Sequence, residues 1–293
     1  MDDAAFAAES VEPGRGAGLI DVVRRRFLLS LLVKKEIRVR YRGSALGLLW
    51  TYVKPAVQFV VFFLAIGVFL GLNRTTPAFP VYLFAGMVMV NYFTEVFGNA
   101  TRTVVQNSAL VKKIYLPREM FPVASTWVGM IHLLPQVVVL IIGALLYGWR
   151  PTPIGVLAAL TAFVLITVLA LGLGLLFGAL NVLFRDFENI VDLLLMVAVW
   201  TSPILYRWTD VQRVLGDGVW LNLYLTNPIT VAVELFHLAF WFPVAEGIPT
   251  DPPVSMPPDL LWHTVIGGSI AVVLLVVGQV VFRRLEGRFA QEL

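Results

Sequence analysis

Long apolar runs alternate with short polar segments along most of the chain. A helix needs about 17–25 mainly apolar residues to cross a bilayer, and six runs reach this range. They lie at residues 46–72, 80–100, 123–147, 154–180, 190–206 and 260–282. The pattern therefore predicts an all-α integral membrane protein, with a six-span permease domain over residues 23–293.

A basic segment precedes the first run. It contains one acid, Glu36, and eight cations: Arg24, Arg25, Arg26, Lys34, Lys35, Arg38, Arg40 and Arg42. Apolar residues interleave with these cations, which predicts an amphipathic interfacial helix along an anionic cytoplasmic leaflet. Residues 37–42 alternate as a strand would, but an isolated strand would leave its edges unpaired, so we expect the frayed end of the helix there.

The distribution of Lys and Arg predicts the orientation in the membrane. All but four of the 22 Lys and Arg fall on one side of this layout; Arg74, Arg150, Arg207 and Arg213 fall on the other. Cations concentrate in cytoplasmic loops, so both termini are expected in the cytoplasm. Residues 1–22 lack the basic start of a signal peptide, and we expect them to form a disordered cytoplasmic tail.

The predicted outer region, residues 207–258, contains one further apolar run, Pro228–Phe242. Asn227 is a good N-cap and Pro228 suits the first helical position, which predicts a helix. The run is shorter than a span and is interrupted by Glu234, so we expect a re-entrant helix in the outer leaflet before the last span. Held by few contacts, this helix could act as an outer gate, with Asn227, Pro228 and Glu234 as its gate residues.

The composition agrees with a membrane protein: 58% of the residues are hydrophobic, 14% are charged, and the mean hydropathy is +0.82. The net charge of +3 does not indicate a nucleic-acid partner, since the cations adjoin the spans and face membrane lipids. The chain has no cysteine, no Gly-Lys dipeptide of a P-loop and no metal-ligand spacing among its histidines. We therefore expect no cofactor, no metal and no enzymatic activity in this chain.

Four segments carry a resemblance to a known family: YRGSALGLLWTYVKP, LPREMFP, LFRDFENIVDLLLMVAVWTSPILY and LTNPI. In this order they resemble the signature segments of type-2 ABC exporter permeases, above all the polysaccharide branch that exports O-antigen, teichoic acid or actinobacterial galactan. The resemblance extends from Arg24 to the C-terminus. It implies a homodimer in the bacterial inner membrane, a separate ABC ATPase dimer that holds ATP and Mg, and a lipid-linked polysaccharide substrate made in the cytoplasm.

The resemblance also implies where an ATPase would dock. The inner loop, residues 101–122, corresponds to a coupling helix, and its coupling residues would be Ser108, Lys112, Lys113 and Arg118. A plain connecting loop, made basic by the positive-inside rule, is the alternative. Arg185 and Asp186 correspond to the family's second inner contact, or else form a local ion pair.

Aromatic side chains are candidates for the lining of a glycan path, because sugar rings stack their apolar faces on aromatic rings. The mid-span candidates are Phe59, Phe63, Tyr92 and Phe93. Interfacial belts also collect aromatic residues, which is the alternative interpretation.

Ionisable groups inside a bilayer are costly and point to function. Lys54 and Glu95 lie at similar depth on adjoining predicted spans and could pair with each other. For His132 we expect a hydrogen bond to a neighbouring helix rather than a role in transport.

The sequence thus predicts the membrane-spanning subunit of an ATP-driven exporter of lipid-linked polysaccharide. A permease for a small lipophilic drug or lipid would share the fold. A membrane enzyme acting on polyprenyl-phosphate is the alternative from another class, although the chain lacks the Asp-x-Asp pair that many metal-dependent glycosyltransferases use.

Overall fold

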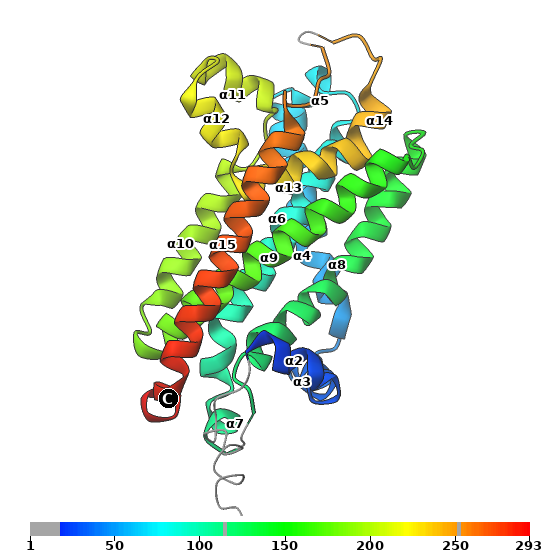
Figure 1. The fold of residues 1–293 in the computed structure, drawn as a ribbon. Coiled ribbons are helices and arrows are strands. Elements are labelled where there is room, and N and C mark those ends of the chain that lie inside the picture. The colour runs from blue at the N-terminus through cyan, green and yellow to red at the C-terminus, as the bar shows by residue number, and fades with distance from the viewer. Residues whose placement is uncertain (1–17, 114–115, 251–252) are drawn as a thin grey trace, which may run out of the picture.

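The computed structural model describes residues 18–113, 116–250 and 253–293 (Figure 1). Within these ranges the chain forms helices and turns without a strand, so the prediction of an all-α protein is confirmed. Residues 1–17 of the predicted tail lie outside the described residues. The end of that predicted tail is ordered, because α2 (Leu19–Arg24) is a helix that buries Val22.

Four long helices form the centre of the bundle: α6 (Phe79–Gln106), α8 (Met120–Leu146), α9 (Pro153–Leu183) and α15 (Leu260–Leu285). Most side chains of α6 are buried, since it packs on both α8 and α9. Glycines bring the backbones close. A Cβ on Gly278 of α15 would lie 2.2 Å from the carbonyl oxygen of Gly172 on α9, and a Cβ on Gly174 would lie 2.5 Å from Cβ of Ala100 on α6. Small residues therefore set these helix contacts.

The predicted amphipathic helix is α3 (Arg26–Arg40), which packs against α8. It lies across the bundle at the end where the C-terminus is found (Figure 1). We call this the inner end and the opposite end the outer end, following the predicted topology. The helix continues to Arg40, so the alternation in residues 37–42 does not form a strand.

The first predicted span stands apart from the central helices. It consists of α4 (Trp50–Phe62) and the π-helical η2 (Phe63–Phe69), and only 6% of its most apolar stretch is buried. Gly43 and Gly47, with φ of 76° and 50°, turn the chain from α3 into this helix, because glycine adopts positive φ without strain. An apolar helix with so little buried surface is suited to lipid or to a second chain.

Among the described residues, six helices are long and apolar enough to cross a membrane. They are Trp50–Phe69, Phe79–Gln106, Met120–Leu146, Pro153–Leu183, Pro228–Ala245 and Leu260–Glu292. This set includes Pro228–Ala245, which contains the run that was expected to be re-entrant. It omits residues 190–206, which were expected to form a span. The latter correspond to α10 (Phe187–Thr201), which has 15 residues and extends only about 22 Å at 1.5 Å per residue. Even so, α10 packs on α6 and α9. It runs from the inner end toward α11 (Trp208–Leu215) and α12 (Val219–Leu225) at the outer end (Figure 1).

The segment Pro228–Ala245 lies obliquely in the outer half of the bundle (Figure 1). It comprises α13 (Pro228–Phe236), η3 (His237–Trp241) and α14 (Phe242–Ala245). At one end, the Trp241 indole donates a hydrogen bond to the carbonyl of Pro77, just before α6, over 2.8 Å. At the other end, Pro228 packs on Gly267 in the first third of α15. Length alone would allow this segment to cross, but these contacts favour a re-entrant position.

The re-entrant segment is firmly packed. Of its apolar stretch 72% is buried, and it contacts α6, α9 and α15. The expectation of a helix held by few contacts is therefore wrong, because three long helices enclose it.

Candidate functional site

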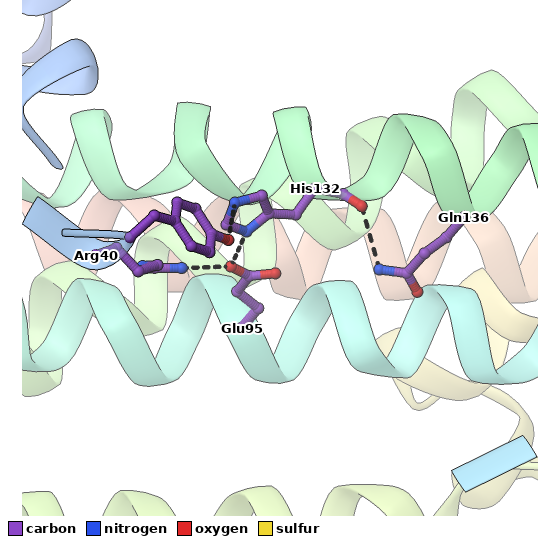
Figure 2. A network of polar contacts seen from close by, with 5 residues as sticks. Arg40, Glu95, His132 and Gln136 are labelled. Carbon is purple, nitrogen blue, oxygen red and sulfur yellow. Dashed lines mark hydrogen bonds and ion pairs between the residues drawn. The ribbon is translucent and has the colours of Figure 1, made fainter. Parts of the chain in front are cut away.

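A polar network joins α3, α6 and α8 at the inner end (Figure 2). The Arg40 guanidinium donates to Glu95 Oε1 over 2.7 Å, and His132 Nδ1 lies 2.5 Å from the same oxygen. The Tyr41 hydroxyl lies 3.0 Å from His132 Nε2. Gln136, one turn along α8, donates from its amide to the His132 carbonyl over 3.2 Å. The network ties the end of the amphipathic helix to two central helices.

Burial explains the form of this network. His132 is 1% exposed, whereas the side chains of Arg40 and Glu95 are 27% and 22% exposed. A buried imidazole needs a partner for each ring nitrogen. The tautomer protonated at Nδ1 satisfies both, because it donates to Glu95 and accepts from the Tyr41 hydroxyl. Glu95 in turn faces a cation and an N–H donor, as an intramembrane carboxylate requires.

A polar cavity of about 680 Å³ adjoins the network. The end of α3, α4, α6 and α8 form its wall. The wall includes the cations Arg40 and Lys54, the Trp50 indole, and the side-chain amides of Asn91 and Gln136. Such a set of cations, amides and a ring can hold phosphate and hydroxyl groups by hydrogen bonds and stacking.

Lys54 does not pair with Glu95. Among the described residues, the ion-pair partners of Glu95 are Arg40 and His132, while Lys54 lies elsewhere on the cavity wall. The predicted pair is wrong because equal depth on two helices does not fix which way their side chains point. His132 does hydrogen-bond a neighbouring helix, as predicted, through Glu95 of α6.

The four aromatic candidates separate into two pairs. Tyr92 and Phe93 are 1% and 2% exposed, and the Tyr92 hydroxyl shares a hydrogen bond with Thr167 of α9 over 2.9 Å. Both rings are therefore buried within this copy of the chain, and their assignment to a glycan path stays a prediction. Phe59 and Phe63 stack with ring centroids 6.0 Å apart, and Phe59 lines an apolar cavity of about 350 Å³. This second pair stays a candidate.

The short helix expected in the inner loop is present as α7 (Ser108–Lys113), and its coupling role stays a prediction. Val111 is 7% exposed and packs in an apolar cluster that includes Phe289 near the C-terminus. Lys112 and Lys113 are exposed at the end of the helix. α7 is thus a short helix that packs through its apolar side and exposes both lysines.

Two further contacts hold the inner surface together. The Asn107 side chain, just before α7, accepts a hydrogen bond from Lys35 of α3. Arg118 lies with its guanidinium carbon 5.8 Å from the centroid of the Phe289 ring, a cation–π contact. Arg118, predicted as a coupling residue, therefore also supports the C-terminal segment on which α7 rests.

The turn between α9 and α10 carries a different ion pair from the predicted one. Arg185 and Asp186 are both exposed, and no ion pair joins them in the described part of the chain. Instead, Arg102 at the end of α6 pairs with Glu188 over 2.6 Å and with Asp192. The spacing of these two acids by four residues places them on one helix face, and this signal in the sequence was missed.

At the outer end the predicted cap is confirmed. Asn227 Oδ1 accepts a hydrogen bond from the Ile229 amide over 3.1 Å, and Pro228 opens the helix. Glu234 is 2% exposed and lies 3.5 Å from His237 Nδ1. His237 stacks on the ring of Tyr82 with centroids 4.0 Å apart. These contacts fasten the predicted gate to α6. Within the described ranges, no group of three or more His, Asp or Glu is placed to hold a metal ion.

Comparison with known proteins gives one consistent result. Residues 28–241 match the family described as ABC-2 type transporter. The chain is 27% identical to the O-antigen export system permease protein RfbA of Myxococcus xanthus over 245 residues, which cover 83% of this chain and 91% of that protein. It is 25% identical over 264 residues to the protein of the same name from Klebsiella pneumoniae, covering 90% and 94%. It is also 22% identical to the polysialic acid transport protein KpsM of Escherichia coli, covering 72% and 80%.

Proposed function

The chain belongs to the ABC-2 type transporter family, and on that premise we propose that it is the membrane-spanning subunit of an ATP-driven exporter of lipid-linked polysaccharide. The observation that carries this proposal is similarity over nearly the whole length of proteins named for O-antigen export. The substrate would be an O-antigen, a teichoic acid or a galactan-like polymer, taken from the cytoplasm across the inner membrane.

A separate ABC ATPase dimer would supply the energy. The exposed lysines of α7 and the exposed turn at Arg185 and Asp186 lie on the inner surface, where such a partner would bind and hold its ATP and Mg. The hydrogen bond between Lys35 and Asn107 connects α7 to α3, and α3 ends at the polar cavity. A movement of the ATPase can thus reach a cavity at the inner end through contacts between neighbouring side chains.

The chain would act as a homodimer with both termini in the cytoplasm. The apolar surfaces of α4 and α10 support pairing of two copies, because they expose large side chains such as Val57, Val61, Leu193 and Trp200. In such a pair, the path of the polymer would lie between the two copies, along these helices.

Copurification tests the proposal. A tagged form of the full chain is coexpressed with a candidate ABC ATPase, extracted in mild detergent and reconstituted in proteoliposomes. We expect a stable complex, ATP hydrolysis, and a bound prenyl-linked saccharide identified by mass spectrometry. A complex that carries only small lipids or drugs, or a chain that binds no ATPase, would refute it.

A further inference from the structure

The wall of the polar cavity contains buried polar atoms without partners. Among the described residues, the side chains of Asn91, Thr94 and Gln136 each hold one such atom: Nδ2, Oγ1 and Oε1. Gln136 is 6% exposed, and its amide nitrogen is used by the His132 carbonyl, which leaves its oxygen pointing toward α6 (Figure 2). Buried polar atoms are nearly always paired in proteins. Three unpaired ones beside a single cavity indicate groups that a ligand would satisfy after small side-chain rotations.

The charges of the cavity favour an anion. Arg40 is bound to Glu95, which also meets His132. Lys54 is a second cation of the wall and has no ion-pair partner in the described part of the chain. One positive charge therefore remains uncompensated in the cavity, at the inner end of a membrane-spanning helix. A phosphate is the anion that a lysine at this depth can meet.

The polar cavity adjoins an apolar one across two shared wall residues. The apolar cavity of about 350 Å³ lies between α4, α6 and α8, and the two share Pro55 and Gln136 in their walls. The apolar cavity is lined by groups such as Phe59, Val139 and Leu140. Adjoining polar and apolar cavities of this size fit one amphipathic ligand, with its head in the first and the start of its hydrocarbon chain in the second.

We propose that these adjoining cavities bind the lipid-proximal part of the exported glycan: the phosphate at Lys54, the first sugar at Asn91, Thr94 and Gln136, and the first prenyl units along Phe59. This assignment rests on the proposed function and names the part of the substrate that one copy of the chain recognises. Trp50, which is 47% exposed at the polar cavity, is placed to cover the sugar.

Binding of defined probes to the full chain tests the site. The chain is placed in phosphatidylcholine nanodiscs and titrated with farnesyl diphosphate, or with the same molecule carrying N-acetylglucosamine. We expect the sugar-bearing probe to bind several-fold more tightly. Lys54→Gln should lower the affinity for both probes about tenfold, which is the loss expected when one charge-assisted contact is removed. Asn91→Ala should remove the advantage of the sugar alone. Lys34→Gln, an exposed lysine of α3 outside the cavity, is the matched control and should bind both probes as before.

A loss of binding in Asn91→Ala can be distinguished from a loss of folding. Asn91→Ala deletes an amide nitrogen that has no partner among the described residues, so the thermal unfolding of this variant should match that of the natural chain. Equal affinity in all variants would overturn the proposal. So would displacement of both probes by phosphatidylglycerol at equal mole fraction, since the cavity would then be a site for phospholipid headgroups. If the complex exports polysaccharide but the chain binds neither probe, the site fails alone. If the probes bind as expected but no saccharide is exported, the proposed function fails alone.

Discussion

Removal of the Glu95 carboxylate should destabilise the fold, mainly through His132. In Glu95→Ala, the partly exposed Arg40 guanidinium can turn toward the headgroups. The Nδ1–H of His132 cannot, because that side chain is 1% exposed. A buried donor without an acceptor costs about 1–3 kcal/mol, and an ion pair in contact with solvent contributes about 0–1 kcal/mol. We therefore expect the free energy of unfolding to fall by about 1–4 kcal/mol, the sum of these two contributions.

Double-mutant cycles separate the contributions of the partners. The free energy of unfolding can be measured by steric trapping in lipid bicelles, with introduced cysteines as attachment points, since the chain has none of its own. Glu95→Ala and His132→Ala should couple by about 1–3 kcal/mol, and Glu95→Ala and Arg40→Ala by less than about 1 kcal/mol. Lys54→Ala is the matched control: it alters the same cavity and should be additive with Glu95→Ala.

Two results would refute this reasoning. Additive effects at Glu95 and His132 would mean that the imidazole finds another acceptor. A coupling of Glu95 with Lys54 as large as that with His132 would restore the pair that the sequence suggested.

Replacing both lysines of α7 by Glu should lower the amount of ABC ATPase that copurifies several-fold. Arg213→Glu, at an exposed position of the outer end, should leave that amount unchanged. Equal amounts with the two variants would contradict the role of α7 in docking the ATPase. Gly278→Ala should lower the free energy of unfolding by about 1–3 kcal/mol, because the added Cβ would overlap the backbone of α9. Gly268→Ala on the same helix is the control, since its Cβ would meet no atom within 4 Å. Similar unfolding of the two variants would disprove the close contact. Single cysteines at Thr226 and Val244 should both react with an impermeant maleimide from outside. If one reacts only in opened membranes, the segment between them crosses.

The helices could be predicted because each depends on its own residues. The runs that became α6, α8, α9 and α15 are long enough to span by themselves, and the basic segment before the first span could only lie at an interface. The helix start at Asn227 was equally local, since the cap bonds a backbone amide two residues away. For the same reason the run at residues 190–206 was overestimated: apolar character continues past the point where Ser202 leaves the helix.

The site could be predicted only in part, because its geometry depends on how helices face one another. Arg40 and Glu95 are 55 positions apart, and they meet only because α3 ends against α6 and α8. Lys54 lines the same cavity as Glu95, yet Arg40 and His132 are the residues that pair with that carboxylate. Tyr92 was correctly placed in mid-span, yet its face of α6 turns toward α9. Hydropathy predicts how deep a residue lies along a membrane helix. Which neighbour its side chain faces depends on how the helices pack against one another.

The contact between α9 and α15 also determines which part of the molecule can hinge. A Cβ on Gly278 would overlap the Gly172 carbonyl, so the two backbones touch with no side chains between them. We therefore expect α9 and α15 to move as one rigid body. α4 instead meets the bundle through side chains, such as the edge contact of Phe59 with Phe84, with centroids 5.5 Å apart. It is joined to α3 through glycines at positive φ. A displacement that widens the polar cavity is therefore a swing of α4 about residues 43–47, with the central helices as the fixed frame.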